Sequence, residues 1–86
     1  MSVRLRIVGP GGLIAEESGL DEVIALRRED RFDPGSQVAI RPSHAPLLMQ
    51  TCAGAVCWRR GEAEGAIPVG RGVLEVVDDC VTVVMT

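Results

Sequence analysis

The fold is decided by the stretch Gly72-Val-Leu-Glu-Val-Val-Asp-Asp-Cys-Val-Thr-Val-Val84. It contains two short apolar runs, Val73 to Val77 and Cys80 to Val84, which are separated by Asp78-Asp79. Valine-rich runs on either side of two turn residues predict a β-hairpin. Two adjacent acidic residues could also suggest a metal ion. Neighbouring turn positions splay their side chains apart, however, so we expect a plain turn.

The rest of the chain repeats this pattern of short apolar runs. Near the N-terminus, the segment from Val3 to Val8 alternates apolar residues with Arg4 and Arg6, as in a strand with one buried face. Further runs follow at 38–42, 47–52, 55–60 and 66–69, with turn residues between them. Strands that recur about every ten residues predict an all-β antiparallel sandwich or barrel.

The length and the composition suit one small domain that spans residues 1–86, and 47% of the residues are hydrophobic. Twelve valines and five isoleucines exceed the seven leucines, and β-branched residues favour strands. A chain of this length has no room for a second lobe or an interdomain cleft, which excludes most classes of enzyme. A domain this small buries only about 60% of its unfolded surface, so its stability margin is thin or it relies on a partner.

The charge pattern excludes several classes of partner. Nine arginines and twelve acidic residues give a net charge of −3, which offers no basic surface for nucleic acid or for an anionic membrane. No segment has the length of a membrane span or the pattern of a signal peptide. We therefore expect no direct membrane insertion, no nucleic acid partner, and a cytosolic protein with reduced thiols.

The sequence contains no motif for a cofactor or a metal ion. The glycine clusters at 9–12 and 70–72 lack the spacing of a phosphate-binding loop, so they are expected to be turns. The three cysteines, Cys52, Cys57 and Cys80, form no C-x-x-C pair, and with one histidine they could make only a Cys3His zinc site, which we do not expect. We expect neither a catalytic residue nor a cofactor, and we expect Glu62 and Glu64 to be solvated charges in a turn.

The segment from Leu13 to Arg31 admits two interpretations. Leu20, Val23 and Ile24 have helical spacing, and Ser18 followed by Asp21 resembles a helix N-cap. The same residues also fit a strand, because apolar positions alternate there as well.

The only histidine, His44, lies in a turn between Pro42 and Pro46. It could bond within its own loop, contact another protein chain, or act in catalysis; the last is disfavoured because no carboxylate nearby in sequence orients it. Prolines on both sides reduce the entropy lost on docking, which favours an interaction loop.

Several segments together resemble the epsilon subunit of rotary ATP synthases. They are Val38-Ala-Ile-Arg-Pro-Ser-His-Ala-Pro-Leu-Leu48, Gly54, Gly70-Arg-Gly-Val-Leu-Glu-Val76 and Val81-Thr-Val-Val84, in the order that family shows. The resemblance covers nearly the whole chain and concerns the N-terminal β-sandwich domain of that subunit. It implies a sandwich of about ten antiparallel strands, in which Leu20 to Leu26 form a strand and not a helix.

The resemblance also implies a role and partners. In that family the sandwich binds the gamma subunit and rests on the polar loops of the membrane ring. It thereby couples rotation to ATP synthesis or hydrolysis as a non-catalytic part of the rotor. The implied location is the cytoplasmic face of the bacterial inner membrane, within a peripheral membrane complex. The chain stops at Thr86, where typical members continue into a helical hairpin, so the hairpin's inhibitory and ATP-binding roles are not implied.

The residues implied for the gamma and ring interface lie between 37 and 46: Gln37, Arg41, Pro42, Ser43, His44, Ala45 and Pro46. Two of these positions, Gln37 and Ser43, depart from the family pattern. Ser43 replaces a glycine, and Gln37 stands where an acidic residue often contacts the ring, so the contact is expected to be weaker or rebuilt through Arg41. The charged loop from Arg27 to Pro34 is about five residues longer than usual.

Further surface candidates for the gamma contact are Arg4, Arg6, Leu47 and Met49. The alternative function is a free-standing small β-sandwich adapter that binds a peptide or protein partner along a sheet edge.

Overall fold

The computed structural model describes residues 1–27 and 36–86, which form nine β-strands and contain no helix. The strands are β1 (Val3–Gly9), β2 (Gly12–Leu20), β3 (Glu22–Arg27), β4 (Ser36–Ile40), β5 (Leu47–Thr51), β6 (Gly54–Arg60), β7 (Ala63–Val69), β8 (Gly72–Val77) and β9 (Cys80–Met85). The all-β class is confirmed, and nine of the expected strands of about ten lie in the described ranges. The expected long charged loop at 27–34 lies almost wholly outside them.

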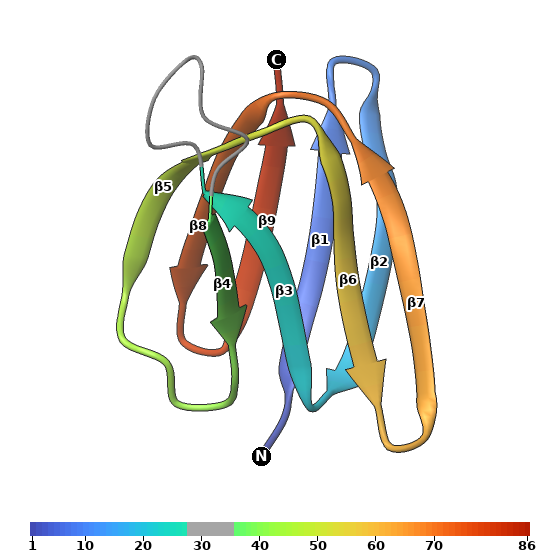
Figure 1. The fold of residues 1–86 in the computed structure, drawn as a ribbon, viewed down its shortest axis with the longest axis vertical. Helices are drawn as coiled ribbons and strands as arrows, with labels where there is room; N and C mark the ends of the chain where they lie inside the picture. The colour runs from blue at the N-terminus through green and yellow to red at the C-terminus, as the bar shows by residue number, and fades with distance from the viewer. Residues whose placement is uncertain (28–35) are drawn as a thin grey trace.

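The strands form one curled sheet that folds into two layers (Figure 1). The back layer has the order β2-β1-β9-β8-β5, and the front layer consists of β4, β3, β6 and β7. The two layers are joined where Arg27 of β3 pairs with Thr51 of β5, just before the chain passes from β5 into β6. Hydrogen bonding is therefore continuous around one side of the sandwich.

One strand pair departs from the antiparallel expectation. β1 and β9 run parallel, with Arg4 opposite Cys80 and Val8 opposite Val84. Parallel neighbours need a long connection, and here nearly the whole chain lies between the two strands. All other pairs are antiparallel, including the predicted hairpin of β8 and β9.

The ambiguous segment after Leu13 forms β2 and β3, so the interpretation as a strand is confirmed. Leu20, Val23 and Ala25 are buried. Ser18 lies in β2, so Ser18 and Asp21 do not cap a helix, and Asp21 has another role. Its backbone N–H donates to the carbonyl of Arg59, and its carboxylate accepts the N–H of Gly61 at 2.7 Å. These bonds hold the β2–β3 corner against β6 and the turn after it.

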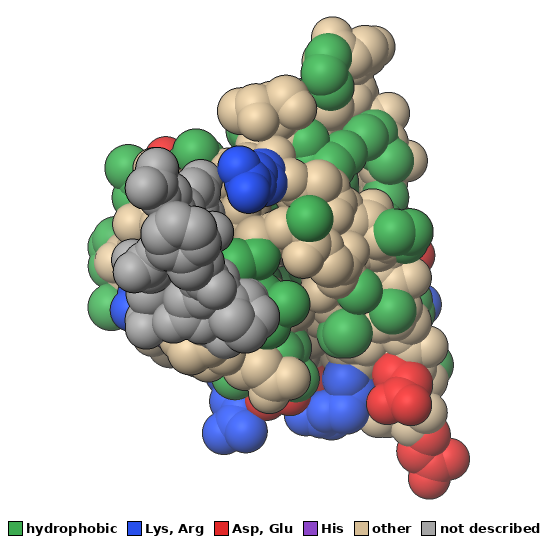
Figure 2. Space-filling model, turned by 45° about the horizontal axis from the view of Figure 1, so that its top comes forward, with side chains coloured by type: hydrophobic (Ala, Val, Ile, Leu, Met, Phe, Trp, Pro, Cys, Tyr) green, Lys and Arg blue, Asp and Glu red, His purple; other side chains and the backbone are tan. Residues whose placement is uncertain are grey.

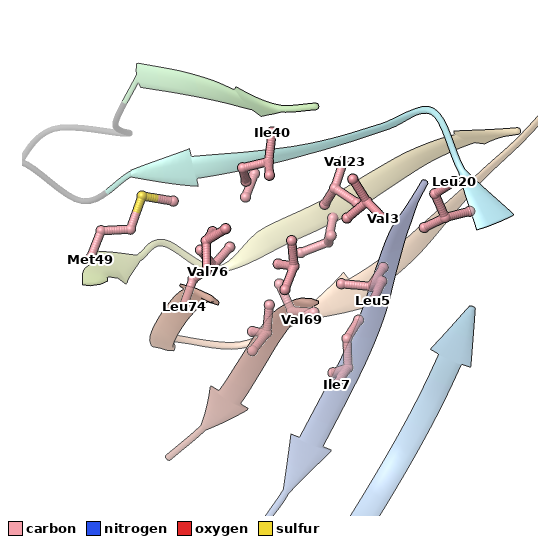
Figure 3. Packing of buried hydrophobic residues seen from close by; sticks show 14 residues of the cluster. Val3, Leu5, Ile7, Leu20, Val23, Ile40, Met49, Val69, Leu74 and Val76 are labelled. Carbon is pink, nitrogen blue, oxygen red and sulfur yellow. The ribbon is translucent and has the colours of Figure 1, made fainter. Parts of the chain in front are cut away.

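The core lies between the two layers, and its side chains come from both (Figure 3). Alternation along the strands is strict in β1 and β8, where every second side chain is buried. The buried hydrophobic residues are Val3, Leu5, Ile7, Leu20, Val23, Ala25, Ile40, Met49, Val56, Val69, Leu74, Val76, Val81 and Val83. The sequence pattern therefore places β-branched residues where a two-layer core needs them.

Candidate partner-binding site

The turn from Arg41 to Pro46, here called the proline turn, connects β4 to β5 at the end of the sandwich where the N-terminus lies (Figure 1). Ser43, Ala45 and Pro46 are exposed, while Pro42 and His44 are half-buried. Six of the seven predicted site residues are thus contiguous on one surface turn.

Asp79 holds the proline turn in place from the β8–β9 turn. Its carboxylate Oδ1 accepts the backbone N–H of Ser43 at 2.6 Å. Bonds from a backbone N–H to a carboxylate are among the stronger hydrogen bonds in proteins. Asp79 also accepts the N–H of Arg4 at its own carbonyl, at 2.9 Å, so the proline turn, the β8–β9 turn and the start of β1 form one connected unit.

Both turns in this unit use left-handed backbone conformations. Ser43 has a φ of 66°, and the two hairpin residues Asp78 and Asp79 have φ values of 48° and 61°. Two successive left-handed residues between strands are typical of a type I′ hairpin, whose twist matches that of the strands. The Asp78-Asp79 turn is therefore confirmed.

Arg41 forms an ion pair within the chain. Its Nε donates a hydrogen bond of 2.7 Å to Oε2 of Glu22, the first residue of β3. The Glu22 side chain is only 13% exposed, whereas that of Arg41 is 73% exposed. Arg41 therefore covers an acidic group of its own sheet while it remains open to solvent.

His44 is oriented by its own loop. Its Nδ1 lies 2.7 Å from the carbonyl oxygen of Ala45. A carbonyl can only accept, so Nδ1 carries the hydrogen and Nε2 of the neutral ring is left as an acceptor. The interpretation that His44 bonds within its loop is confirmed, and Nε2 remains for another contact.

Gln37 does not join the other predicted residues. It lies in β4, opposite Leu26, and the proline turn begins only after β4 has ended. With a rise of about 3.3 Å per residue, about 10 Å of strand separates Gln37 from Ile40, the last residue before the turn. Gln37 and His44 therefore belong to different parts of the surface.

One further candidate for the surface contact, Met49, is wrong, and a second, Leu47, is only partly exposed. Met49 is 6% exposed and belongs to the core, and Leu47 packs against the core from the next inward position of β5. The strand alternation directs both side chains inward, although Leu47 stays partly exposed, and the exposed residues of this strand are Leu48 and Gln50. Arg4 and Arg6 are exposed as expected, and Arg6 pairs with Glu16 at 3.2 Å.

The sequence reasoning missed an exposed apolar row that crosses the outer face of the back layer. The ladder places Val73 beside Val84, Val84 beside Val8, and Val8 beside Leu13. Val73, Val84 and Leu13 are 38%, 46% and 54% exposed. The sequence does contain a sign of this row, because some outward positions of β8 and β9 carry valine, whereas a face exposed to water usually carries polar residues.

Within residues 1–27 and 36–86, no three His, Cys, Asp or Glu side chains are grouped so as to hold a metal ion. The three cysteines are half-buried. In the same ranges, no helix has the length and apolar character needed to span a membrane.

No protein-family model matches this chain, and no curated protein sequence matches it. Among solved structures, a chain in the cryo-EM structure of the central stalk and c-ring of the Tetrahymena thermophila mitochondrial ATP synthase is similar, with a TM-score of 0.72. The match has 15% sequence identity and covers all of this chain and 65% of that chain. At this identity the likeness establishes the β-sandwich fold.

Proposed function

We propose that this chain is a non-catalytic, epsilon-type subunit in the central stalk of a proton- or sodium-translocating ATP synthase. It binds the gamma subunit and the polar loops of the membrane ring, and so couples rotation to ATP synthesis or hydrolysis at the cytoplasmic face of a bacterial inner membrane. The observation that carries the proposal is the likeness of the whole chain to a fold present in an ATP synthase central stalk.

The exposed apolar row supports a large protein partner on the back layer. Its members, Val8, Leu13, Val73 and Val84, form one line across four neighbouring strands. Apolar surface contributes about 25 cal/mol per Å2 when a partner removes it from water, before the entropic cost of association. We assign this row to the gamma subunit.

The proline turn suits the second contact, with the ring. Asp79 and the two prolines restrain it before any partner arrives, so little backbone entropy is lost on docking. His44 Nε2 and the exposed guanidinium of Arg41 are groups that polar loops can bind. Gln37 lies farther along β4, away from the proline turn, so we place it outside this contact.

The test of the proposed function is complex formation with the gamma subunit from the same organism. The two purified proteins are mixed at micromolar concentration and separated by size exclusion. We expect one peak with equal amounts of both chains. If the proteins elute separately, the proposed function is wrong.

A further inference from the structure

A concave groove lies on the outer face of the front layer, away from the exposed apolar row. Its volume is about 390 Å3. The apolar part is formed by Ile24, Cys57 and Ala66, which lie side by side because Ile24 pairs with Cys57 and Cys57 pairs with Ala66. Hydrophobic side chains lie on this face over β6 and β7, with acidic side chains at its lower end (Figure 2).

A glycine beneath the groove leaves room for an aromatic ring on the core-facing side of β6 and β7. Gly65 pairs with Trp58, and a Cβ added to Gly65 would lie 2.5 Å from the indole ring. Any larger residue here would collide with the ring of Trp58. The guanidinium of Arg60, two residues along the same strand, lies over the Trp58 ring, 4.9 Å from its centroid. Arg60 also forms an ion pair of 3.1 Å with Glu17 of the back layer. The groove floor is therefore tied to the second layer.

The charges at the rim do not balance within the chain. Glu22 is paired with Arg41, and Arg59 is paired with Asp21 at 3.4 Å. Glu64 lines the groove opposite Arg59, yet it forms no ion pair with any residue in the described part of the chain. The groove thus presents one uncompensated carboxylate beside an apolar surface.

The groove also lies beside a sheet edge. In the described residues, β7 pairs only with β6. Pro68 has no N–H for the ladder, and proline is tolerated in a strand where its nitrogen faces away from the neighbouring strand. Glu64 and Ala66 lie four and two residues before Pro68 along β7. Every second residue of a strand directs its backbone groups to the same side, so the N–H and C=O groups of Glu64 and Ala66 point to the free edge. Their side chains lie on the groove face.

We propose that the groove and the free edge of β7 form a binding site for an extended segment of another protein, with a Lys or Arg two residues from a leucine-like residue. The segment adds a strand to β7. Its apolar side chain packs against Ala66, where the groove meets the free edge, and its cation pairs with Glu64. Spacing of two follows from the strand period, which puts residues i and i+2 on one face. This site does not depend on the proposed role in the rotor.

The test is a titration of the isotope-labelled protein with the blocked peptide Thr-Lys-Thr-Leu-Thr-Lys-Thr, followed by NMR. The peptide reads the same in both directions, so it presents lysine and leucine to the groove in either orientation. We expect amide shifts in β7 and the facing part of β6, with a Kd on the order of 1 mM or below. Absence of shifts at about 2 mM peptide would overturn the proposal.

Two comparisons separate this site from non-specific attraction to an acidic protein. Glu64→Lys should weaken binding of the lysine peptide about fivefold and make Thr-Glu-Thr-Leu-Thr-Glu-Thr the better ligand. The control Glu62→Lys changes an acidic residue in the adjacent turn, outside the groove lining, and should keep the wild-type preference. Equal effects of the two variants, or binding that survives N-methylation of the peptide backbone, would overturn the proposal.

Discussion

Ser43 adopts a left-handed backbone conformation, with φ at 66°, at the centre of the proline turn. A residue with a Cβ is strained in this region by about 1 kcal/mol, whereas glycine is not. The strain persists because Asp79 holds the Ser43 N–H and the flanking prolines fix the path of the chain. The proline turn is therefore a restrained feature of the surface and not a loose connection.

Replacing Ser43 with glycine should stabilise the protein. The release of strain outweighs the added freedom of the unfolded chain, so we expect an increase of about 0.5 kcal/mol, or about 3 °C in Tm. Thermal unfolding followed by circular dichroism measures it. Ala45→Gly is the matched control, because Ala45 lies in the same turn without a positive φ, and it should lower Tm. A lower Tm for Ser43→Gly would contradict this account.

Individual residues were predicted in part from the sequence. The two prolines and the lone histidine pointed to a stiff turn, and the Asp78-Asp79 hairpin was evident from its flanking valines. The bond from Asp79 to Ser43 joins residues far apart in the chain, and no local pattern contains it. Met49 was misplaced because a run of apolar residues does not reveal its inward positions until the register of the strand is known.

At the scale of single elements, β8 and β9 depend on one glycine. A Cβ at Gly72, the first residue of β8, would overlap the backbone carbonyl of Val84 in the paired strand. The obstacle is the backbone of a strand that is paired on both sides, with β8 and with β1, so it cannot move aside as a flexible side chain would. The Gly70-Arg71-Gly72 sequence, interpreted as a turn, thus also contains a close contact between strands.

The variant Gly72→Ala should therefore be strongly destabilised, by about 3 kcal/mol. Gly70→Ala is the matched control, because a Cβ at Gly70 meets no atom within 4 Å and its φ is not positive, and its stability should stay near that of the wild type. Urea unfolding midpoints compare the two. Similar midpoints for both variants would contradict the prediction and show that the backbone at Val84 can shift to make room for the added Cβ.

Element type was predictable where the apolar pattern was regular and ambiguous where it was not. In the segment from Leu13 to Arg31, helical and strand periods fit equally well, and only partners in the sheet decide between them. β7 begins at Ala63, so it takes in Glu64 and Gly65, which were assigned to a turn because of their composition. Pairing with β6 overrides that weak local preference, and it moves Glu64 from a solvated turn to the groove.

At the scale of the whole molecule, three surfaces face in different directions. The apolar row lies on the outside of the back layer, the groove lies on the outside of the front layer, and the proline turn lies at one end. Long-range pairing between strands places them there, and for that reason the sequence indicated only the proline turn. The two-layer class itself followed from strand spacing and from the abundance of valine.

The apolar row should be required for binding to gamma. Val84→Glu places a charge at its centre, so we expect the affinity for the gamma subunit to fall at least about tenfold. Val77→Glu is the matched control, since Val77 is 45% exposed and Val84 is 46% exposed, and Val77 lies outside the row. Isothermal titration measures both. An equal loss in the two variants would place the contact elsewhere.

The proline turn should matter for coupling and not for binding to gamma. His44→Ala combined with Pro46→Ala removes a polar contact and loosens the backbone, which should weaken the ring contact by about fivefold. In membrane vesicles, fewer ions should then be pumped for each ATP hydrolysed. Glu62→Ala, in another turn, is the control. An unchanged ratio of pumping to hydrolysis for the double variant would exclude the proline turn from the ring contact.

The parallel pairing of β1 with β9 also has a consequence for how the protein folds. β1 lies between β2 and β9, so it obtains its second neighbour only after the strands from β2 to β8 have been synthesised and β9 has emerged from the ribosome. Until then β1 presents an open edge to other nascent chains. Contacts of such large sequence separation are typical of domains that fold in milliseconds to seconds, so we expect the sandwich to fold slowly and only after β9 has been synthesised.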